Sequence, residues 1–244
     1  MTSFNLSEHL AREHKRTPFS QYLREIVYGG NDGIVTTFAV VAGFAGASKD
    51  PAASAIPVIT VLLFGIANLF SDGLSMSLGS FISLRADQDV YKSEKNREHR
   101  EILHEPDKEA EETQTILMAK GFNKKDATTI TALYRKNPAY WTEFMMKDEL
   151  EMQSPENEHP VFVAVSTFLS FVGFGVIPLL PYLFHFTHET FGYSVSATIL
   201  ALTLLGGLRG IVSQERPMRA ILETVFIGGI AASAAYTVGL FFRV

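Results

Sequence analysis

The chain has 244 residues, no cysteine, 47% hydrophobic residues, 19% charged residues and a formal net charge of −5. The lack of cysteine excludes a disulfide-stapled domain and a thiolate-ligated zinc or iron–sulfur site, and the acidic balance excludes a basic nucleic-acid binder. The charge is unevenly distributed, because residues 86–158 hold 17 acidic and 11 basic residues, while the other 171 residues hold 9 acidic and 10 basic residues. The composition therefore predicts a chain that is apolar at both ends and acidic in the middle.

Five stretches have the length and composition of membrane spans, since a helix needs about 20 apolar residues to cross a bilayer core. They are residues 26–47, 55–84, 161–184, 193–208 and 220–242. The first begins too late and is too long to be a cleaved signal peptide. A soluble protein with buried helices is the alternative, but the uncharged third stretch is hard to place in so small a domain. We therefore expect an all-α membrane protein with five transmembrane helices and a helical cytoplasmic insert between the second and third.

The basic residues near the ends of these stretches predict the orientation of the chain. They are Arg12, Lys15, Arg16 and Arg24 before the first stretch, Arg85 and Lys92 after the second, and Arg209, Arg216 and Arg219 between the fourth and fifth. The opposite side carries only Lys49 and Arg243. Because basic residues gather on the cytoplasmic side, residues 1–25 and 86–158 are predicted to be cytoplasmic, with membrane helices in 26–85 and 159–244 and the C-terminus outside.

The acidic segment is expected to be helical. Residues 87–104 continue from the second span without glycine or proline, until Pro106 breaks the helix. Further helices are predicted over residues 107–120, 123–135 and 140–152, the first of them ending at Gly121. Few large apolar residues are available, so this segment is expected to pack against the membrane part or a second copy of the chain.

Pairs of glutamates in this segment indicate a metal site. Glu98 and Glu101 share one helix face, and Glu109 and Glu112 repeat the spacing after Pro106. On adjacent antiparallel helices the two pairs would gather four carboxylates, whose mutual repulsion raises their pKa values and favours divalent metals, so that metal binding releases protons.

The fourth predicted helix adds Met145, Glu149 and Met152 at spacings of four and three. Thioethers favour softer metals than magnesium or calcium. Charged helices are nevertheless usually solvated faces and methionine stripes usually core packing, and spacing alone slightly favours that interpretation.

A Glu-x-x-His pattern, as found in di-iron bundles, occurs at Glu101 with His104 and at Glu156 with His159. The second lies between Pro155 and Pro160 and is not expected to be helical. The sequence therefore gives only weak support to a di-iron oxidase.

Polar residues inside the predicted spans indicate a transport path, because ionisable groups at bilayer depth are costly. Asp32 lies among glycines in the first span, and Asn68, Asp72 and Met76 recur every four residues in the second. An aspartate that caps or bonds a neighbouring helix is an equally good interpretation of Asp72.

Several runs of the chain match a known pattern. They are residues 24–33 (REIVYGGNDG), 36–39 (TTFA), 71–79 (SDGLSMSLG), 97–102 (REHREI), 144–147 (FMMK) with 149–150 (EL), and 178–181 (PLLP). Together they resemble the vacuolar iron transporter family over nearly the whole chain from about Arg24. The resemblance implies a dimeric transporter, not an enzyme, that moves ferrous iron, sometimes manganese, out of the cytoplasm in exchange for protons and needs no prosthetic group.

The resemblance also implies roles for single residues. Asp32 and Met76 match the family's carboxylate and methionine on the translocation path, and Met145 or Met146 matches its cytoplasmic sulfur ligand. The residues that match its cytoplasmic glutamates are Glu98, Glu101, Glu109, Glu112 and Glu149. Plant members carry a glutamate where this chain has Asn68 and a small residue where it has Asp72, so the carboxylate would lie one turn further along the same face.

The predicted partners are therefore divalent metal ions, protons, the lipid bilayer and a second copy of the chain, and not nucleic acid. The predicted location is the plasma membrane of a bacterium or the vacuolar membrane of a eukaryote. A membrane-anchored ferritin-like iron oxidase and a metal sensor that does not transport are the alternatives.

Overall fold

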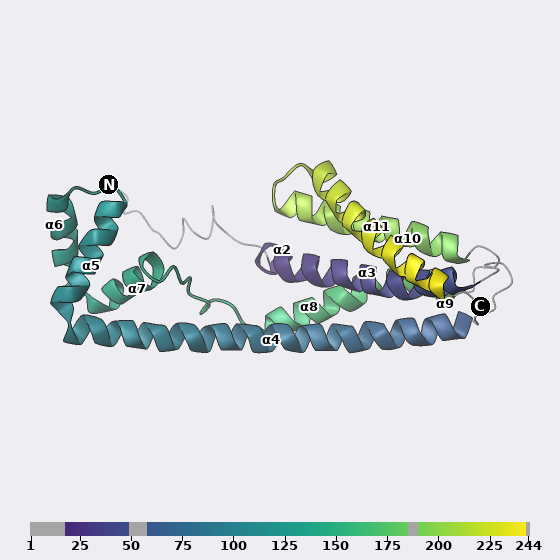
Figure 1. Ribbon diagram of the computed structural model, residues 1–244, viewed down its shortest axis with the longest axis horizontal. Coiled ribbons are helices and arrows are strands. Elements are labelled where there is room, and N and C mark those ends of the chain that lie inside the picture. The colour runs from purple at the N-terminus through teal and green to yellow at the C-terminus, as the bar shows by residue number, and fades with distance from the viewer. Residues whose placement is uncertain (1–17, 49–57, 185–189, 243–244) are drawn as a thin grey trace, which may run out of the picture. The chain divides into compact units, whose positions relative to one another are not determined.

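The computed structural model describes residues 18–48, 58–184 and 190–242, and all the regular secondary structure in these ranges is helical (Figure 1). The helices are α2 (Pro18–Gln21), α3 (Leu23–Ala47), α4 (Val58–His104), α5 (Pro106–Ala119), α6 (Lys124–Tyr134), α7 (Pro138–Asp148), α8 (Pro160–Gly175), the 3-10 helix η1 (Ile177–Leu179), α9 (Leu180–Leu183), α10 (Thr190–Val212) and α11 (Pro217–Phe241). The chain forms two compact units, one of Met1–Phe81 with Val161–Val244 and the other of Ile82–Pro160, and α4 contributes to both.

The first unit, the apolar unit, contains helices of membrane-spanning length. Within the described ranges, four helical segments are long and apolar enough to cross a bilayer: α4, the segment Pro160–Leu183 formed by α8, η1 and α9, α10, and α11. The first predicted span is also a helix, the 25-residue α3. Asn31 and Asp32 interrupt its apolar run, and it is not one of the four.

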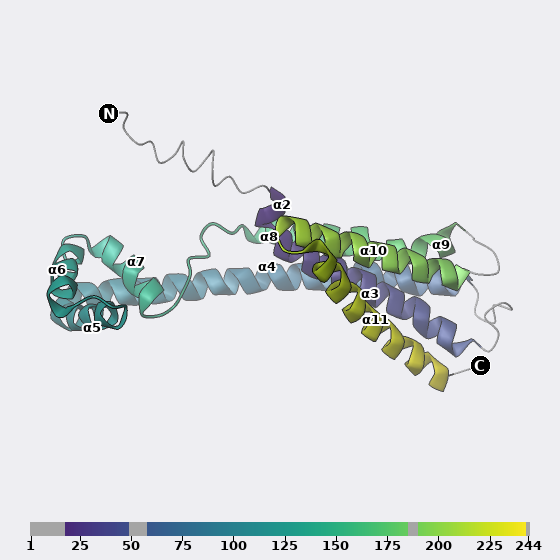
Figure 2. The same ribbon diagram turned by 90° about the horizontal axis from the view of Figure 1, so that it is seen from above.

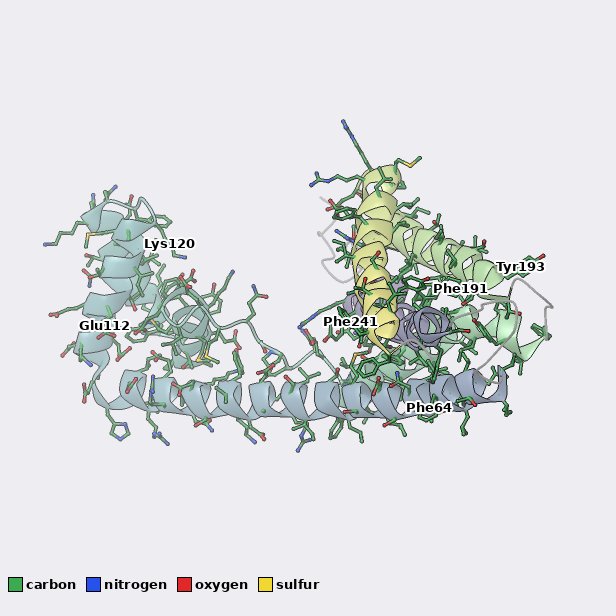
Figure 3. All side chains as sticks on the ribbon, turned by 45° about the vertical axis from the view of Figure 1, so that its right-hand side comes forward. Phe64, Glu112, Lys120, Phe191, Tyr193 and Phe241 are labelled. Carbon is green, nitrogen blue, oxygen red and sulfur yellow. The ribbon has the colours of Figure 1, made fainter. Side chains whose placement is uncertain are left out.

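Helix α3 packs chiefly against α10 and α11 (Figure 2). Ile34 of α3 is fully buried against Leu202 and Leu205 of α10. Phe191, at the start of α10, stacks between Phe38 of α3 and Tyr236 of α11 with ring centroids 6.2 and 6.1 Å apart (Figure 3). The core of the apolar unit therefore surrounds α3.

The second unit, the acidic insert, consists of the last part of α4 with α5, α6 and α7. Pro106 begins α5, and Gly121, with a φ of 101°, follows its end. The Asn123 side chain accepts a hydrogen bond from the Asp126 amide at the start of α6, as Asn137 does from Tyr140 at the start of α7. These caps and breaks explain why the insert folds as separate short helices.

The arrangement differs from the sequence prediction in two places. Helix α5 rises steeply from α4 instead of lying antiparallel beside it (Figure 1). The last helix of the insert ends at Asp148 and does not continue to Met152, because the Leu150 amide bonds to the Met145 carbonyl, the Met152 amide bonds to the Met146 carbonyl, and Glu151 adopts a φ of 52°. Met145 and Glu149 therefore keep the predicted spacing of one helical turn, but the prediction that Met152 continues the same helical stripe is wrong.

Candidate metal-binding site

Five glutamates of the acidic insert converge where α4 turns into α5. Carboxylate oxygens of Glu98, Glu101 and Glu109 lie within 4.8 Å of one another, and so do those of Glu109, Glu112 and Glu149. Glu98 and Glu101 come from α4, Glu109 and Glu112 from α5, and Glu149 from the C-cap of α7 (Figure 3 labels Glu112). The structure thus brings together all five glutamates that the sequence singled out, in two groups that share Glu109. Their role in binding metal stays a prediction.

The two inner carboxyl groups are buried. Glu98 and Glu109 are each only 2% exposed, and Oε1 of Glu98 and Oε2 of Glu109 have no hydrogen-bond partner. Carboxyl oxygens of the two side chains lie within 4.8 Å of each other. Because two buried like charges at this separation repel, the metal-free pair is favoured when one proton is shared between them. A buried polar atom without a partner costs free energy, and a cation is one partner that would satisfy both oxygens.

Burial and crowding shift the acidities of these groups. Burial, followed by the charges of Glu109 and Glu149, raises the pKa of Glu98 to about 8. Burial and the charge of Glu112 raise the pKa of Glu109, and burial with the charges of Glu112 and Glu101 raises the pKa of Glu149. Glu98 therefore keeps its proton near neutral pH, and a cation bound to this carboxyl group would displace the proton.

The outer carboxylates have basic neighbours. Glu101 lies 3.8 Å from Arg97, and Glu112 lies 3.7 Å from Lys108. Both basic side chains are at least half exposed, so these ion pairs are weak and easily exchanged. The outer rim is therefore partly neutralised, whereas the inner pair depends on its shared proton.

Two buried methionines lie on α7. Met145 and Met146 are both fully buried, and Met145 packs in a small core with Ile102, Ala110 and Trp141. The Met145 sulfur accepts a hydrogen bond from the hydroxyl of Thr113 on α5, with a distance of 3.3 Å between oxygen and sulfur. Sequence reasoning missed Thr113 because a single threonine in an acidic helix belongs to no spacing pattern.

The five carboxylates suit a hard or borderline divalent cation. Carboxylate oxygens bind hard and borderline divalent ions, and a thioether adds preference for softer ones. Neither glutamate group in the described residues includes a histidine. His104 is exposed, with its Nδ1 near the Arg100 carbonyl, and Glu156 with His159 lies outside any helix, so the two Glu-x-x-His sequences do not form a di-iron site.

The predicted transport-path residues lie in the apolar unit. Asp32 on α3 and Asn68, Asp72 and Met76 on α4 are all half-buried, and Asp32 is within electrostatic range of Asp72. Asn68 also lines a groove of about 610 Å³ between α3, α4 and α11, whose other lining residues include Ser71, Gly43, Phe64 and Gly239. The structure therefore puts the two aspartates near each other, and the transport role of all four residues stays a prediction.

Comparison with known proteins gives the family. The VIT family profile matches residues 23–240. Vacuolar iron transporter 1 of Tulipa gesneriana is 34% identical over 233 residues, covering 94% of this chain and 92% of that protein. The proteins of the same name from Eucalyptus grandis and Arabidopsis thaliana are 33% identical over 232 residues and 35% identical over 217 residues, covering 94% and 88% of this chain and 90% and 84% of theirs. The match extends over both units, and this chain belongs to the VIT family.

Proposed function

We propose that the protein is a multi-pass membrane transporter that moves ferrous iron, or manganese, from the cytoplasm across the membrane in exchange for protons. Its relatives are named vacuolar iron transporters. One observation supports the mechanism in particular, namely the buried Glu98–Glu109 pair. Its unpartnered oxygens could bind a divalent cation, and the proton that the pair shares would be released on binding. The family is one of transporters, so the ferritin-like oxidase is set aside.

The proposed topology has five spans. Helix α3 is added to the four candidate spans as a further span, because it is 25 residues long and packs against α10 and α11, which both have membrane-spanning composition. A helix satisfies its own backbone groups, so beyond Arg24 and Glu25 in its first turn, the costly residues of α3 in a bilayer are Asn31 and Asp32. Residues 1–25 and the insert of residues 86–158 are then cytoplasmic, and residues 26–85 and 159–244 form the membrane part.

In this mechanism the insert captures the metal. Glu98, Glu101, Glu109, Glu112 and Glu149 supply carboxylate oxygens, and Met145 or Met146 supplies a sulfur. Because ligands must be deprotonated, binding expels the proton that Glu98 and Glu109 share. Iron or manganese is the cargo, and the protein needs no prosthetic group.

The path through the membrane follows from the polar residues on α3 and α4. Metal passes along Asp32, Asn68, Asp72 and Met76, whose oxygen and sulfur atoms replace part of its hydration shell. Protons from the far side then protonate the aspartates, which weakens metal binding and permits release. Asp72 supplies the carboxylate that plant members of the family are expected to carry one turn earlier.

We place two copies of the chain side by side in the membrane. The resemblance implies a homodimer, and the groove beside Asn68, lined by apolar residues of α3, α4 and α11, is a surface that a second copy would cover. The membrane is the plasma membrane if the protein is bacterial, or the vacuolar membrane if it is eukaryotic, as the names of the plant relatives indicate for those proteins.

The test is flux through purified protein in liposomes that contain a metal-sensitive dye and a pH-sensitive dye. Adding Fe²⁺ under reducing conditions, or Mn²⁺, should produce metal entry coupled to proton exit. Asp32→Ala should abolish both fluxes, whereas Asp89→Ala, an exposed carboxylate on α4, should leave them unchanged. Metal binding without any flux would show a sensor instead of a transporter, and unchanged flux in Asp32→Ala would remove that residue from the path.

A further inference from the structure

Both groups of converging glutamates have a basic side chain at their outer edge. Arg97 lies 3.8 Å from Glu101, the outer member of the first group, and Lys108 lies 3.7 Å from Glu112, the outer member of the second. A positive charge at this distance reduces the repulsion among the carboxylates of each group. The same charge repels any metal ion that approaches those carboxylates, so each basic side chain competes with the proposed cargo.

Each basic side chain also has a second acidic partner. The Arg97 guanidinium lies 2.8 Å from Glu94, and the Lys108 ammonium lies 3.9 Å from Glu105, in both cases at a spacing of three residues on the helix. Within the described residues, neither glutamate group includes Glu94 or Glu105. Arg97 and Lys108 can therefore give up the outer glutamates to a metal and still keep an ion pair.

The two basic side chains differ in how firmly they are held. Arg97 contacts its two partners through different nitrogens, Nη2 and Nε, so its planar guanidinium is fixed between them. The Lys108 ammonium lies at nearly equal distances from Glu112 and Glu105, on a flexible four-carbon stem, and the side chain is 64% exposed. Ion pairs at this exposure are weak. Lys108 is thus the better suited of the two to exchange one glutamate partner for the other.

We propose that Lys108 is a tethered counter-ion of the glutamate site, which a divalent cation displaces from Glu112 and which then pairs with Glu105. A divalent cation carries twice the charge of the ammonium group, so it gains more from the same carboxylates. Na⁺ and K⁺ carry only the charge of the ammonium group, which is already held beside Glu112, so they gain nothing by replacing it. Lys108 therefore makes the site selective for divalent over monovalent cations. The inference rests on the proposed function, because it requires that the glutamates bind the metal cargo.

The first test measures Mn²⁺ binding to the full-length protein in detergent by calorimetric titration. Lys108→Gln removes the competing charge and should tighten Mn²⁺ binding about two- to fivefold, the range that one exposed ion pair supplies. Lys108→Arg keeps the charge and should bind Mn²⁺ as the unmodified protein does. Lys125→Gln removes the charge of an exposed lysine on α6 in the same unit and should leave the affinity unchanged. An unchanged affinity in Lys108→Gln, or an equal gain in Lys125→Gln, would overturn the proposal.

The second test separates exchange between two partners from a general effect of charge. Glu105→Gln removes the alternative partner of Lys108, so the ammonium group stays at Glu112 and Mn²⁺ binding should weaken about twofold. In a protein that already carries Lys108→Gln, the same change should have little effect, because no lysine is left to exchange. Losses of equal size in the two backgrounds would show a long-range charge effect and overturn the exchange.

The third test repeats the Mn²⁺ titrations at low and high KCl concentration. Without the tethered charge, K⁺ gathers at the carboxylates instead, so the affinity of Lys108→Gln should fall more steeply with KCl than that of the unmodified protein. Equal dependence on KCl would contradict the role of Lys108 in selectivity. An unmodified protein that binds no Mn²⁺ would contradict both this inference and the proposed function, whereas normal binding without a response to Lys108→Gln would contradict this inference alone.

Discussion

Glu98 and Glu109 are the residues at which we expect folding and the proposed cation binding to compete. Their carboxyl groups are almost completely buried, carry unpartnered oxygens and share a proton. Such an arrangement is costly for the metal-free fold, since buried like charges repel. Stability and metal affinity should therefore respond in opposite directions to changes at these two positions.

The stability of the metal-free protein should depend on pH in a defined direction. The pKa of Glu98 is raised from 4.5 to about 8 on folding, so between these pH values the folded chain binds more protons than the unfolded chain. The free energy of unfolding should then fall as pH rises through this window, by at most about 1.4 kcal/mol per pH unit from this group. Thermal unfolding of the metal-free protein from pH 5 to 9 measures the slope, and a rise in stability across the window would contradict the assignment.

Glu98→Gln should separate stability from binding. Glutamine keeps the shape and can donate to Glu109, so at pH 8 the metal-free protein should unfold at a higher temperature than the unmodified one. Losing a central carboxylate should weaken Co²⁺ binding at least tenfold. Glu111→Gln, an exposed position on α5, should change neither quantity. A variant that loses both stability and binding would indicate that Glu98 serves mainly to hold the insert together.

Among the elements, α3 depends on close contact with its neighbours. A Cβ added at Gly33 would lie 2.2 Å from the Phe171 carbonyl oxygen on α8, whereas one added at Gly173 on α8 would meet nothing within 4 Å. Gly33→Ala must therefore move one helix away from the other, and should lower the free energy of unfolding by about 1–3 kcal/mol. Gly173→Ala should be neutral or stabilising by up to about 1 kcal/mol. Thermal unfolding in detergent compares the two, and equal stabilities would show that α3 and α8 separate easily.

The sequence predicts elements better than it predicts how they meet. The continuation of α4 to His104 and the break at Pro106 follow from the absence and presence of proline. The end of α7 at Asp148 does not follow from the sequence, because it depends on a positive φ at Glu151, which is not a glycine. The steep rise of α5 from α4 is set by packing in the insert and has no local signal.

The same limit applies to the candidate site. Glutamates three residues apart predict a shared helix face, and the structure gathers them. The spacing predicts Glu149 inside a helix, whereas it lies at the C-cap of α7, with a carboxylate oxygen within 4.8 Å of those of Glu109 and Glu112. The hydrogen bond from Trp141 on α7 to Thr113 on α5 could not be predicted, because it joins two helices and follows no spacing pattern.

At the scale of the whole molecule, the proposed five-span topology can be tested directly. The chain has no cysteine, so any introduced cysteine is its only thiol. Gln21, Ser93 and Phe242 are exposed positions on α2, on α4 within the acidic insert, and after α11. With α3 crossing the membrane, Gln21→Cys and Ser93→Cys should react with an impermeant thiol reagent from the same side, and Phe242→Cys from the other. Labelling of Gln21→Cys and Ser93→Cys from opposite sides would show that α3 does not cross.

The complete burial of Met145 and Met146 also has a consequence for chemical damage. Ferrous iron converts peroxide into radicals that oxidise thioethers to sulfoxides, which are polar and no longer fit an apolar core. Burial keeps peroxide in solution away from these two sulfurs, but a radical formed at iron captured by the glutamates, as proposed, would arise inside the same unit. Methionine sulfoxide reductases need access to the side chain, so repair would have to wait for the acidic insert to open. Under the proposed function, oxidative damage to these two buried methionines should therefore persist longer than damage to exposed side chains.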